Sequence, residues 1–433
     1  MNTPVVDPSR IPISGVPSVD IDLHTDENLL DSIGVAARLR EAGPVVWLTK
    51  YSVYALPRFR EVSQALKDWE TFTSEEGVGL NEYINSIKDV SLHTHGRQHD
   101  EIRHVESRPL APDKLAALGL RLREYAEGLV RDLGRRTRVD GVRDIAMKMP
   151  LDVITDLIGL DDAGRDNLYT WGVAGFNGFG PLHAPLTAPA LEHFQSYFRY
   201  ARESIPAKIK PGGWADQLFV KGRAVGWSEK QCRAAIGDYV VPSLDTTIHA
   251  TSAGLKLFAQ HPEQWSRICH DRSLLKSAVT EIVRLASPVR YFTRLITRDV
   301  EIGGVMLPAR SRVLVMFASA KGDESEFPNP DLFDIERNPV SHVGWGAGKH
   351  ACLGKALARM ELTVLFDVLA DHYQRFELGH YSHSVNNVIQ GLDRLELTLI
   401  PAGDGRSPEG SNSTAVPSTP CSLNHSTMTA PKE

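Results

Sequence analysis

The chain contains 433 residues, 42% of them hydrophobic, so it can bury a large core. Its formal net charge of −6 argues against nucleic acid as the main partner. Its four cysteines are widely spaced without a Cys-x-x-Cys pair, which argues against a zinc site or a disulfide framework and suits a reducing cytoplasm. No stretch approaches the roughly 20 apolar residues that span a bilayer, so we expect a cytoplasmic protein that works without a membrane.

The first part of the chain is predicted to become mainly helical after a short strand-forming start. Residues 1–22 contain several prolines and are expected to form an extended arm. Two runs with apolar and aromatic residues, 45–48 and 51–56, predict strands. Helix formers dominate from about residue 112 to residue 284, and a Gly/Pro-rich loop that starts at Gly178 interrupts them.

Strands return later in the chain. Residues 295–317 favour β-structure, and Gly303-Gly304 predicts a tight turn between apolar runs. A helix and a last pair of strands, which ends near residue 400, follow. Residues 403–433 are rich in Ser, Thr, Pro and Gly and lack aromatic residues, so they cannot offset the entropy of ordering. We therefore predict a mainly α fold with small β-sheets, in one domain at 23–402, and a disordered tail.

One predicted helix is unusually long. Ser228 and Gln231 form a capping-box pattern, and helical sequence continues for about 30 residues, or roughly 50 Å. Pro242 removes a backbone donor in the middle, so the helix should kink or open there, just before Asp245 and Thr246. The pattern leaves two interpretations open, because a proline is often only a bend and threonine often bonds back to the i−4 carbonyl.

The most informative segment is a glycine-rich loop that carries Cys352. Gly346 and Gly348 precede the cysteine, and Gly354 follows it at the start of an amphipathic helix. Free N–H groups at a helix N-terminus favour the thiolate, so we expect a lowered pKa and a metal-ligating sulfur, as in haem-thiolate proteins. The alternative is a buried cysteine that acts as a small apolar residue.

This loop resembles the haem-binding loop of the cytochrome P450 family, Phe-Gly-x-Gly-x-His-x-Cys-x-Gly. The resemblance implies the cytochrome P450 fold, a triangular prism with haem b between the long oxygen-side helix and the helix after the cysteine loop. It also implies that the Cys352 thiolate is the axial ligand and that His350 contacts a haem propionate. Trp345 stands where the family has Phe, which keeps an aromatic wall but adds an N–H that needs a partner. The matching positions are Gly346, Gly348, His350, Cys352 and Gly354.

A second match lies in the long helix. Asp245 and Thr246 match the family's Ala/Gly-Gly-x-Asp-Thr-Thr segment, whereas Pro242 and Ser243 replace the usual small pair. The resemblance implies that the Thr246 hydroxyl holds a water that donates protons during oxygen activation and that Asp245 connects this water to solvent. We therefore assign Asp245 and Thr246 as the catalytic residues.

Further basic residues match contacts to the haem carboxylates. His99 and Arg103 correspond to the family's His-x-x-x-Arg pair, and Arg294 corresponds to another contact. Charge-assisted hydrogen bonds make these residue types suitable for carboxylates. Their assignment depends on the resemblance, because single His and Arg residues are usually surface groups.

An acidic residue and two arginines match a structural element of the family. Glu281 and Arg284 share one helix face, and Arg337 corresponds to the family's second arginine. The family buries this set, which survives burial only when every donor is satisfied. The ordinary interpretation of Glu281 and Arg284 alone is a solvated pair worth under about 1 kcal/mol.

Within the family, the resemblance is to bacterial soluble enzymes that oxidise para-substituted benzoic acids, such as 4-methoxybenzoate demethylases. In those enzymes the residues matching Phe176, Phe179 and Phe292 pack the substrate ring, and we assign Leu244 and Asp238 to the same pocket. An edge-to-face ring contact gains of order 1 kcal/mol, although core packing is the usual role of Phe. The supporting runs are residues 39–46, 77–80, 176–181, 342–344 and 388–392.

One difference from those enzymes concerns the substrate carboxylate, which they clamp with Arg and Ser side chains. The aligned positions here are Ser86 and Asp89 in a loop and Gly237 and Asp238 on the helix. An Asp repels a carboxylate, so we expect a small aromatic without one. A guaiacol-like methoxyphenol fits, and oxidation of its O-methyl carbon gives a hemiacetal that collapses to phenol and formaldehyde.

The resemblance implies a monooxygenase that uses O2 and two electrons. The sequence has no Gly-x-Gly-x-x-Gly fingerprint and no cysteine cluster, so we expect a separate ferredoxin or flavodoxin-type donor with its NAD(P)H reductase. Lys349, Lys355 and Arg359 flank the cysteine and are candidates for its docking patch, although a solvated face explains them equally well.

Three alternatives stay open. The first is oxidation of para-substituted benzoates such as 4-methoxybenzoate, with Lys88 or Arg97 as the cation that reaches the carboxylate. The second is a haem-thiolate binding or sensing protein without turnover, which would need no proton relay. The third is a peroxide-driven haem enzyme.

Overall fold

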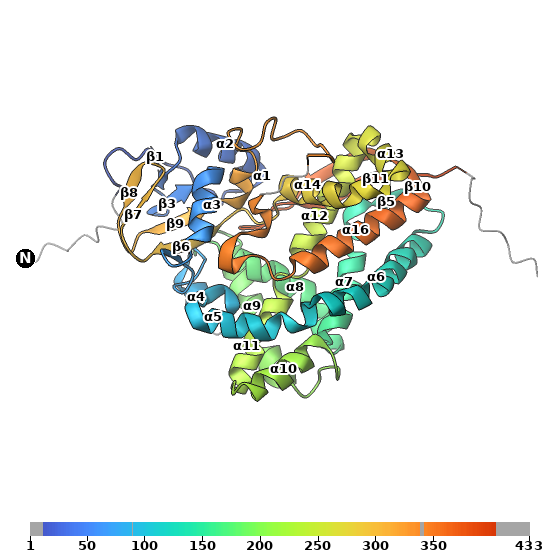
Figure 1. Ribbon diagram of the computed structural model, residues 1–433, viewed down its shortest axis with the longest axis horizontal. Coiled ribbons are helices and arrows are strands. Elements are labelled where there is room, and N and C mark those ends of the chain that lie inside the picture. The colour runs from blue at the N-terminus through green and yellow to red at the C-terminus, as the bar shows by residue number, and fades with distance from the viewer. Residues whose placement is uncertain (1–11, 89, 338–341, 404–433) are drawn as a thin grey trace, which may run out of the picture.

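The computed structural model describes residues 12–88, 90–337 and 342–403 and confirms a mainly helical fold with small sheets (Figure 1). The helices are α1 (Asp26–Leu30), α2 (Ser32–Ala42), α3 (Phe59–Lys67), α4 (Glu82–Asn85), α5 (Gly96–Glu106), α6 (Pro112–Leu133), α7 (Lys148–Ile158), α8 (Asp162–Gly178), α9 (Thr187–Ser204), α10 (Trp214–Ala224), α11 (Glu229–Val240), α12 (Asp245–Gln260), α13 (Pro262–His270), α14 (Leu275–Ala286), α15 (Phe317–Ala320) and α16 (Lys355–His372). The strands are β1 (Ser18–Val19), β2 (Val46–Leu48), β3 (Val53–Leu56), β4 (Phe72–Thr73), β5 (Arg138–Asp140), β6 (Phe292–Ile296), β7 (Val300–Ile302), β8 (Val305–Leu307), β9 (Arg312–Val315), β10 (Tyr373–His383) and β11 (Leu392–Pro401).

The main sheet joins strands from residues 18–73 to strands from residues 292–315. Its order is β1-β2-β3-β9-β6-β4, with parallel pairing of β1 with β2 and of β3 with β9. The predicted β-rich stretch forms β6 to β9, and β7 and β8 are joined at Gly303 and Gly304, whose φ angles are 58° and 76°. The predicted turn is therefore confirmed, because these left-handed angles favour glycine. The described part of the predicted arm contains β1, so it is anchored to the sheet.

The predicted long helix is divided into two helices. Both hydrogen bonds of the capping box at Ser228 are present, as predicted, and α11 ends at Val240. Residues 241–244 leave the helical path before α12 begins at Asp245. The prediction that the helix should kink or open at Pro242 is therefore confirmed, and the structure shows an opening, because proline removes a backbone donor there.

The predicted burial of the ion-pair set is confirmed. Arg284 donates to both carboxylate oxygens of Glu281 at 2.7 and 2.8 Å, and both side chains have 0% exposure. Arg337 Nε donates to the same carboxylate at 3.0 Å. Arg284 also donates to the carbonyl oxygens of Lys321 and Pro330, so its buried donors have partners.

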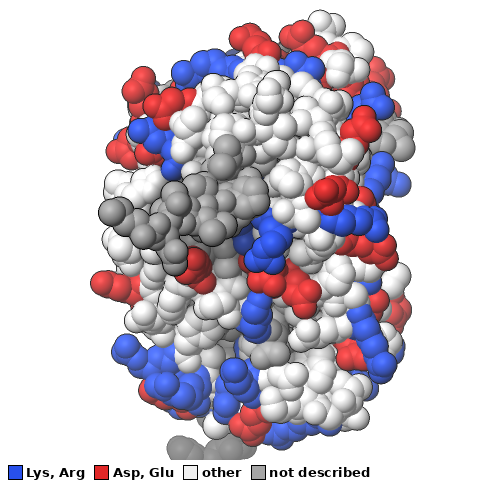
Figure 2. All heavy atoms as spheres, turned by 90° about the vertical axis from the view of Figure 1, so that its left-hand side faces the viewer, with Lys and Arg blue, Asp and Glu red and all other residues white. Residues whose placement is uncertain are grey.

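The surface and the ends of the chain bear on the remaining predictions. No helix in the described ranges is long and apolar enough to cross a membrane. On the face in Figure 2, acidic and basic side chains are interspersed over the surface, including the middle of the view. The predicted tail lies outside the described residues except for Gly403.

Candidate active site

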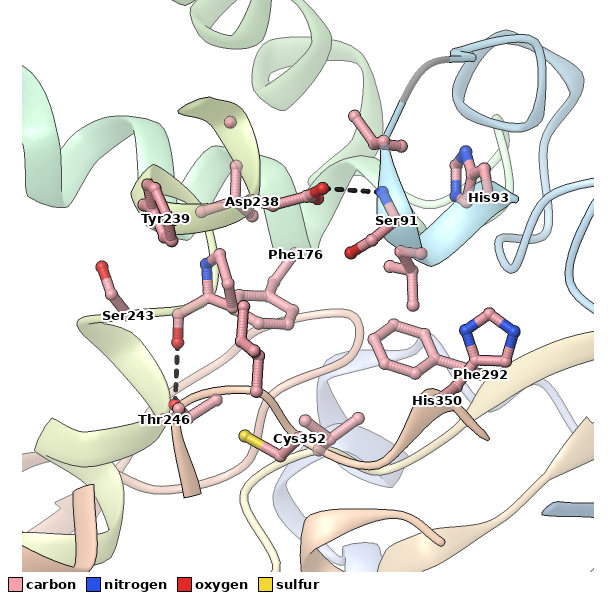
Figure 3. A pocket seen from close by; sticks show the side chains of 18 of the residues that line it. Ser91, His93, Phe176, Asp238, Tyr239, Ser243, Thr246, Phe292, His350 and Cys352 are labelled. Carbon is pink, nitrogen blue, oxygen red and sulfur yellow. Dashed lines mark hydrogen bonds between the residues drawn. The ribbon is translucent and has the colours of Figure 1, made fainter. Parts of the chain in front are cut away.

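A cavity of about 800 Å³ lies between the break that separates α11 from α12 and the cysteine loop before α16 (Figure 3). Its size is in the usual range for cofactor and small-molecule sites. Three of the predicted site residues do not line it: Leu244, Asp245 and His99. The predicted site residues that do line it are Arg103, Phe176, Phe179, Asp238, Thr246, Phe292, Arg294, Trp345, Gly346, His350 and Cys352.

The glycine loop folds back on itself and directs the cysteine into the cavity. Cys352 N–H donates to the Trp345 carbonyl at 2.8 Å, and Gly346 has a φ of 66°. Gly348 has a φ of 65°, and a Cβ there would lie 2.4 Å from the Leu66 carbonyl oxygen, so the loop requires glycine at this point. The sulfur faces the cavity just before α16 (Figure 3).

The prediction of a lowered thiol pKa was wrong for the protein alone. Burial raises the pKa of Cys352, and it outweighs the lowering effect of the Gly354 and Lys355 backbone N–H groups and of Arg103. The N–H groups at the helix start therefore lower the pKa of the thiol, as expected. Burial raises this pKa by more. Coordination to a metal ion deprotonates such a thiol outright.

Two buried ring nitrogens without partners lie close to the cysteine. Among the described residues, neither Trp345 Nε1 nor His350 Nδ1 has a hydrogen-bond partner, whereas His350 Nε2 bonds to Ser74 Oγ at 3.1 Å. Burial and the nearby arginines hold the pKa of His350 well below its usual range, so its ring is neutral. Arg103 donates to the Ala351 carbonyl at 3.0 Å and to His99 Nε2 at 3.3 Å. His99 is buried and supports Arg103, so it does not reach the cavity itself.

These groups fit the haem that the sequence implies. A thiol projects into a largely apolar cavity, and Arg103, Arg294 and the unpartnered ring nitrogens of Trp345 and His350 belong to residues that line the same cavity. These residues suit haem, which is flat and largely apolar. The cysteine sulfur can bind its iron atom, and the arginines can bind its carboxylates.

The start of α12 differs from the predicted relay. Thr246 Oγ1 donates to the Pro242 carbonyl at 2.9 Å, which is the back-bond left open by the sequence, and its side chain also lines the cavity. Asp245 is 1% exposed, and neither of its oxygens has a partner in the described structure. Burial raises the pKa of Asp245 to about 7. The expected direct link from Asp245 to solvent is therefore absent, because its side chain is buried in the core.

The predicted aromatic wall is present. The rings of Phe179 and Phe292 are 5.4 Å apart at an interplanar angle of 71°, and those of Phe176 and Phe179 are 6.4 Å apart. All three side chains line the cavity. The assignment of Leu244 to this pocket was wrong, because its side chain is 0% exposed and packs in the core at the helix break.

Asp238 lies at the end of the cavity away from the cysteine (Figure 3). Its Oδ2 accepts the Ser91 backbone N–H at 2.6 Å. Ser86 and Gly237 line the same cavity, as the alignment predicted, whereas Asp89 lies outside the described residues.

The basic residues named for other roles are mostly engaged. Lys88 lines the cavity and donates to the Glu75 carbonyl, whereas Arg97 is 92% exposed and does not line it. Arg97 is therefore excluded as a cation for the substrate. Lys349 pairs with Asp100 at 2.9 Å, while Lys355 is exposed at the start of α16.

Four cavity or second-layer residues were missed. Glu361 is 3% exposed and lines the cavity, its Oε1 has no partner among the described atoms, and burial raises its pKa to about 8. The available signal was an acid between the apolar positions of α16. Tyr197 and Glu106 gave no signal, because their positions depend on the packing of distant helices. Ser243 was visible only as a departure from the family's pattern next to Pro242.

Comparison with known proteins identifies the class. The sequence profile described as cytochrome P450 matches residues 215–384. The chain is 32% identical to cytochrome P450 CYP199A2 of Rhodopseudomonas palustris over 409 residues, which cover 91% of this chain and 99% of that protein. It is 28% identical to linalool 8-monooxygenase of Pseudomonas putida over 400 residues, covering 88% and 98%. The solved structure of cytochrome P450 CYP109Q5 from Chondromyces apiculatus superposes with a TM-score of 0.73 at 26% identity, covering 88% of this chain and 99% of that one.

The chain therefore belongs to the cytochrome P450 family and has the predicted fold. It is an oxidoreductase, a monooxygenase that uses O2 and a redox partner, with haem b and a cysteine thiolate as axial ligand. Relatives named as monooxygenases favour turnover over the alternative of a binding or sensing protein.

Proposed function

We propose that this cytochrome P450 holds haem through Cys352 and removes the O-methyl group of a small methoxy-aromatic molecule. Trp345, Gly346 and His350 line the site next to the sulfur, and Arg103 and Arg294 supply positive charge for the haem carboxylates. Bound haem supplies the oxygen activation. The protein supplies the ligand, the orientation of the substrate and the protons.

Proton supply is assigned to the start of α12. The Thr246 hydroxyl lies on the cavity wall and, with its own proton directed at the Pro242 carbonyl, offers lone pairs to a water. Asp245 holds and releases a proton near neutral pH, because burial raises its pKa to about 7. Since Asp245 does not line the cavity, a side-chain rotation or an intervening water must carry the proton to Thr246.

The substrate proposal depends on one observation, the Asp238 carboxyl group on the wall of the cavity that the three phenylalanines also line. Phe176, Phe179 and Phe292 provide a place for a flat ring, with edge-to-face contacts worth of order 1 kcal/mol. A buried Asp facing a substrate carboxylate costs several kcal/mol unless one of them takes a proton. A neutral hydroxyl instead donates a hydrogen bond to Asp238, which favours methoxyphenols of the guaiacol type.

Ligand titration of the ferric enzyme tests this proposal. We expect guaiacol or 4-alkyl methoxyphenols to bind at least about tenfold tighter than 4-methoxybenzoate, a difference of about 1.4 kcal/mol. Formaldehyde and the free phenol should appear when the electron-transfer partners are supplied. Tighter binding and faster demethylation of the benzoate would refute the substrate assignment.

Oxidation of para-substituted benzoates is the second candidate. The basic side chains of Lys88, Arg202, Lys230 and Arg233 line the same cavity and favour entry of an anion. Arg233 already donates hydrogen bonds to Glu229 and to the Ile205 carbonyl. It is therefore less available than the other three cations to bind a substrate carboxylate.

We assign the electron donor to a separate ferredoxin or flavodoxin-type protein with an NAD(P)H reductase, working in the cytoplasm. The described chain consists of the single helical fold with its cavity, so electrons must come from outside. Dependence of product formation on NADH and both partner proteins tests this assignment, and equal turnover with peroxide alone would favour the peroxide-driven alternative.

A further inference from the structure

Two carboxyl groups from separate helices meet at the end of the cavity away from Cys352. Asp238 of α11 lines the cavity, and Glu106, the last residue of α5, lies behind it with 0% exposure. Neither oxygen of Glu106 accepts a hydrogen bond from any described group. Burial raises the pKa of Glu106 well above its usual range, and the charge of Asp238 raises it further. A fully buried carboxyl group without a donor favours its neutral form, so we assign a proton to Glu106 that can be shared with Asp238.

Three neighbouring groups act on Asp238 against the effect of burial. Burial also raises the pKa of Asp238, against the lowering effects of Glu106, Ser91 and Arg103. Arg103 on α5 is the cation that acts on both acids, and the Ser91 N–H holds one Asp238 oxygen at 2.6 Å. Because Asp238 also lines the cavity, its carboxyl group can face a bound ligand.

Two tyrosines complete this end of the cavity. Tyr239 on α11 donates to the Glu106 backbone carbonyl at 2.7 Å. Tyr197 on α9 lines the cavity and is 2% exposed, yet its hydroxyl has no partner among the described residues. Burial and the charge of Asp238 hold the pKa of Tyr197 far above its usual range, so the phenol keeps its proton. A buried hydroxyl without a partner costs about 1–3 kcal/mol, which a ligand hydroxyl at this place would offset.

We propose that Glu106 is a positioning residue for substrate recognition: by sharing one proton with Asp238, it leaves a single charge that accepts a hydrogen bond from a neutral hydroxyl of the substrate. Tyr197 binds the same hydroxyl. This proposal rests on the proposed function, and it adds that the pair rejects carboxylates and selects alcohols and phenols. A neutral hydroxyl both donates and accepts, which matches one carboxylate oxygen and one phenol.

The test uses three ligands that share a methoxyphenyl ring: 4-methoxybenzyl alcohol, 4-methoxybenzoate and 4-methoxytoluene. In the wild-type ferric holoenzyme at pH 7.5, we expect the alcohol to bind about tenfold tighter than the benzoate and about threefold tighter than the toluene. Asp238→Asn keeps an acceptor but removes the charge, so the ratio of alcohol to benzoate affinity should fall to within about threefold.

Glu106→Gln keeps a donor toward Asp238 but cannot ionise. At pH 7.5 it should bind the alcohol like the wild type. At alkaline pH the wild type should lose affinity as the shared proton leaves and two like charges face each other, whereas the variant should not. Glu101→Gln, an exposed acid on the same helix, is the matched control and should follow the wild type.

The outcomes separate this inference from the proposed function. If the wild type demethylates none of the three ligands, both the proposed function and this inference are wrong. If they are demethylated but Asp238→Asn keeps the tenfold preference, or Glu106→Gln keeps the wild-type pH profile, the inference alone is overturned.

Discussion

Replacing Arg284 by alanine should destabilise the fold strongly, because it strands a buried charge. The fully buried Glu281 would keep only its bond to Arg337, and the carbonyls of Lys321 and Pro330 would lose their donor. Breaking a buried pair from one side costs about 3–5 kcal/mol. The unfolding entropy is about 2.1 cal/mol/K per residue, which gives about 0.8 kcal/mol/K for roughly 390 ordered residues. Dividing the lost free energy by this entropy gives an expected decrease in Tm of about 4–6 °C.

Thermal unfolding of the purified holoenzyme, with its haem content, measures this loss. Arg223→Ala is the matched control, because Arg223 pairs with Glu229 at 2.7 Å but both side chains are about half exposed, and such pairs contribute under about 1 kcal/mol. The double variant Glu281→Gln/Arg284→Ala removes the stranded charge and should recover part of the loss. If Arg284→Ala and the control lose the same Tm, the reasoning about burial is refuted.

Three further predictions concern the site. Cys352→Ala should remove the red-shifted Soret band that thiolate-ligated haem gives in its reduced carbon monoxide complex, and a variant that keeps this band would exclude Cys352 as the ligand. Thr246→Ala should bind substrate normally but form less product per NADH and more hydrogen peroxide, whereas unchanged coupling would reduce Thr246 to a structural partner of the Pro242 carbonyl. Burial raises the pKa of Asp245 to about 7 in the folded protein. In the unfolded chain this carboxyl group has its ordinary pKa of about 4 and loses its proton earlier. The free energy of unfolding therefore falls as the pH rises from about 4 to 7. Asp245→Asn should remove this loss of stability, which is about 4 kcal/mol at pH 8. If the Tm of the variant and the Tm of the wild type change equally between pH 5.5 and 8, this prediction is wrong.

The features that the sequence predicts well are those fixed by neighbouring residues. The capping box at Ser228, the turn at Gly303-Gly304 and the loop before Cys352 each depend on residues within a few positions of one another. The opening at Pro242 was also predictable as an event, because the cause lies in one residue. Its extent was not, since packing against neighbouring helices decides whether a helix bends or breaks.

The features that the sequence does not reveal depend on distant contacts. Glu106 and Asp238 are 132 positions apart, so their pairing follows only from how α5 and α11 pack. Asp245 was expected to reach solvent because its type is usually exposed, but the break before α12 turns it into the core. For Cys352, the helix-start effect on the pKa was visible in the sequence, whereas the opposing burial was not.

The parallel pairing of β3 with β9 has a consequence for how the chain folds. Leu56 lies opposite Val315, and His24 Nε2 bonds to the Tyr291 hydroxyl at 2.6 Å, across 267 positions. At about 5–20 residues per second, a ribosome takes about 13–50 s to make the roughly 260 residues that separate the two strands. During that time β2 and β3 have apolar faces and an unpaired edge, which are prone to aggregate. Slower synthesis at full temperature should therefore lower the yield of soluble protein, whereas cooling, which weakens hydrophobic association, should raise it.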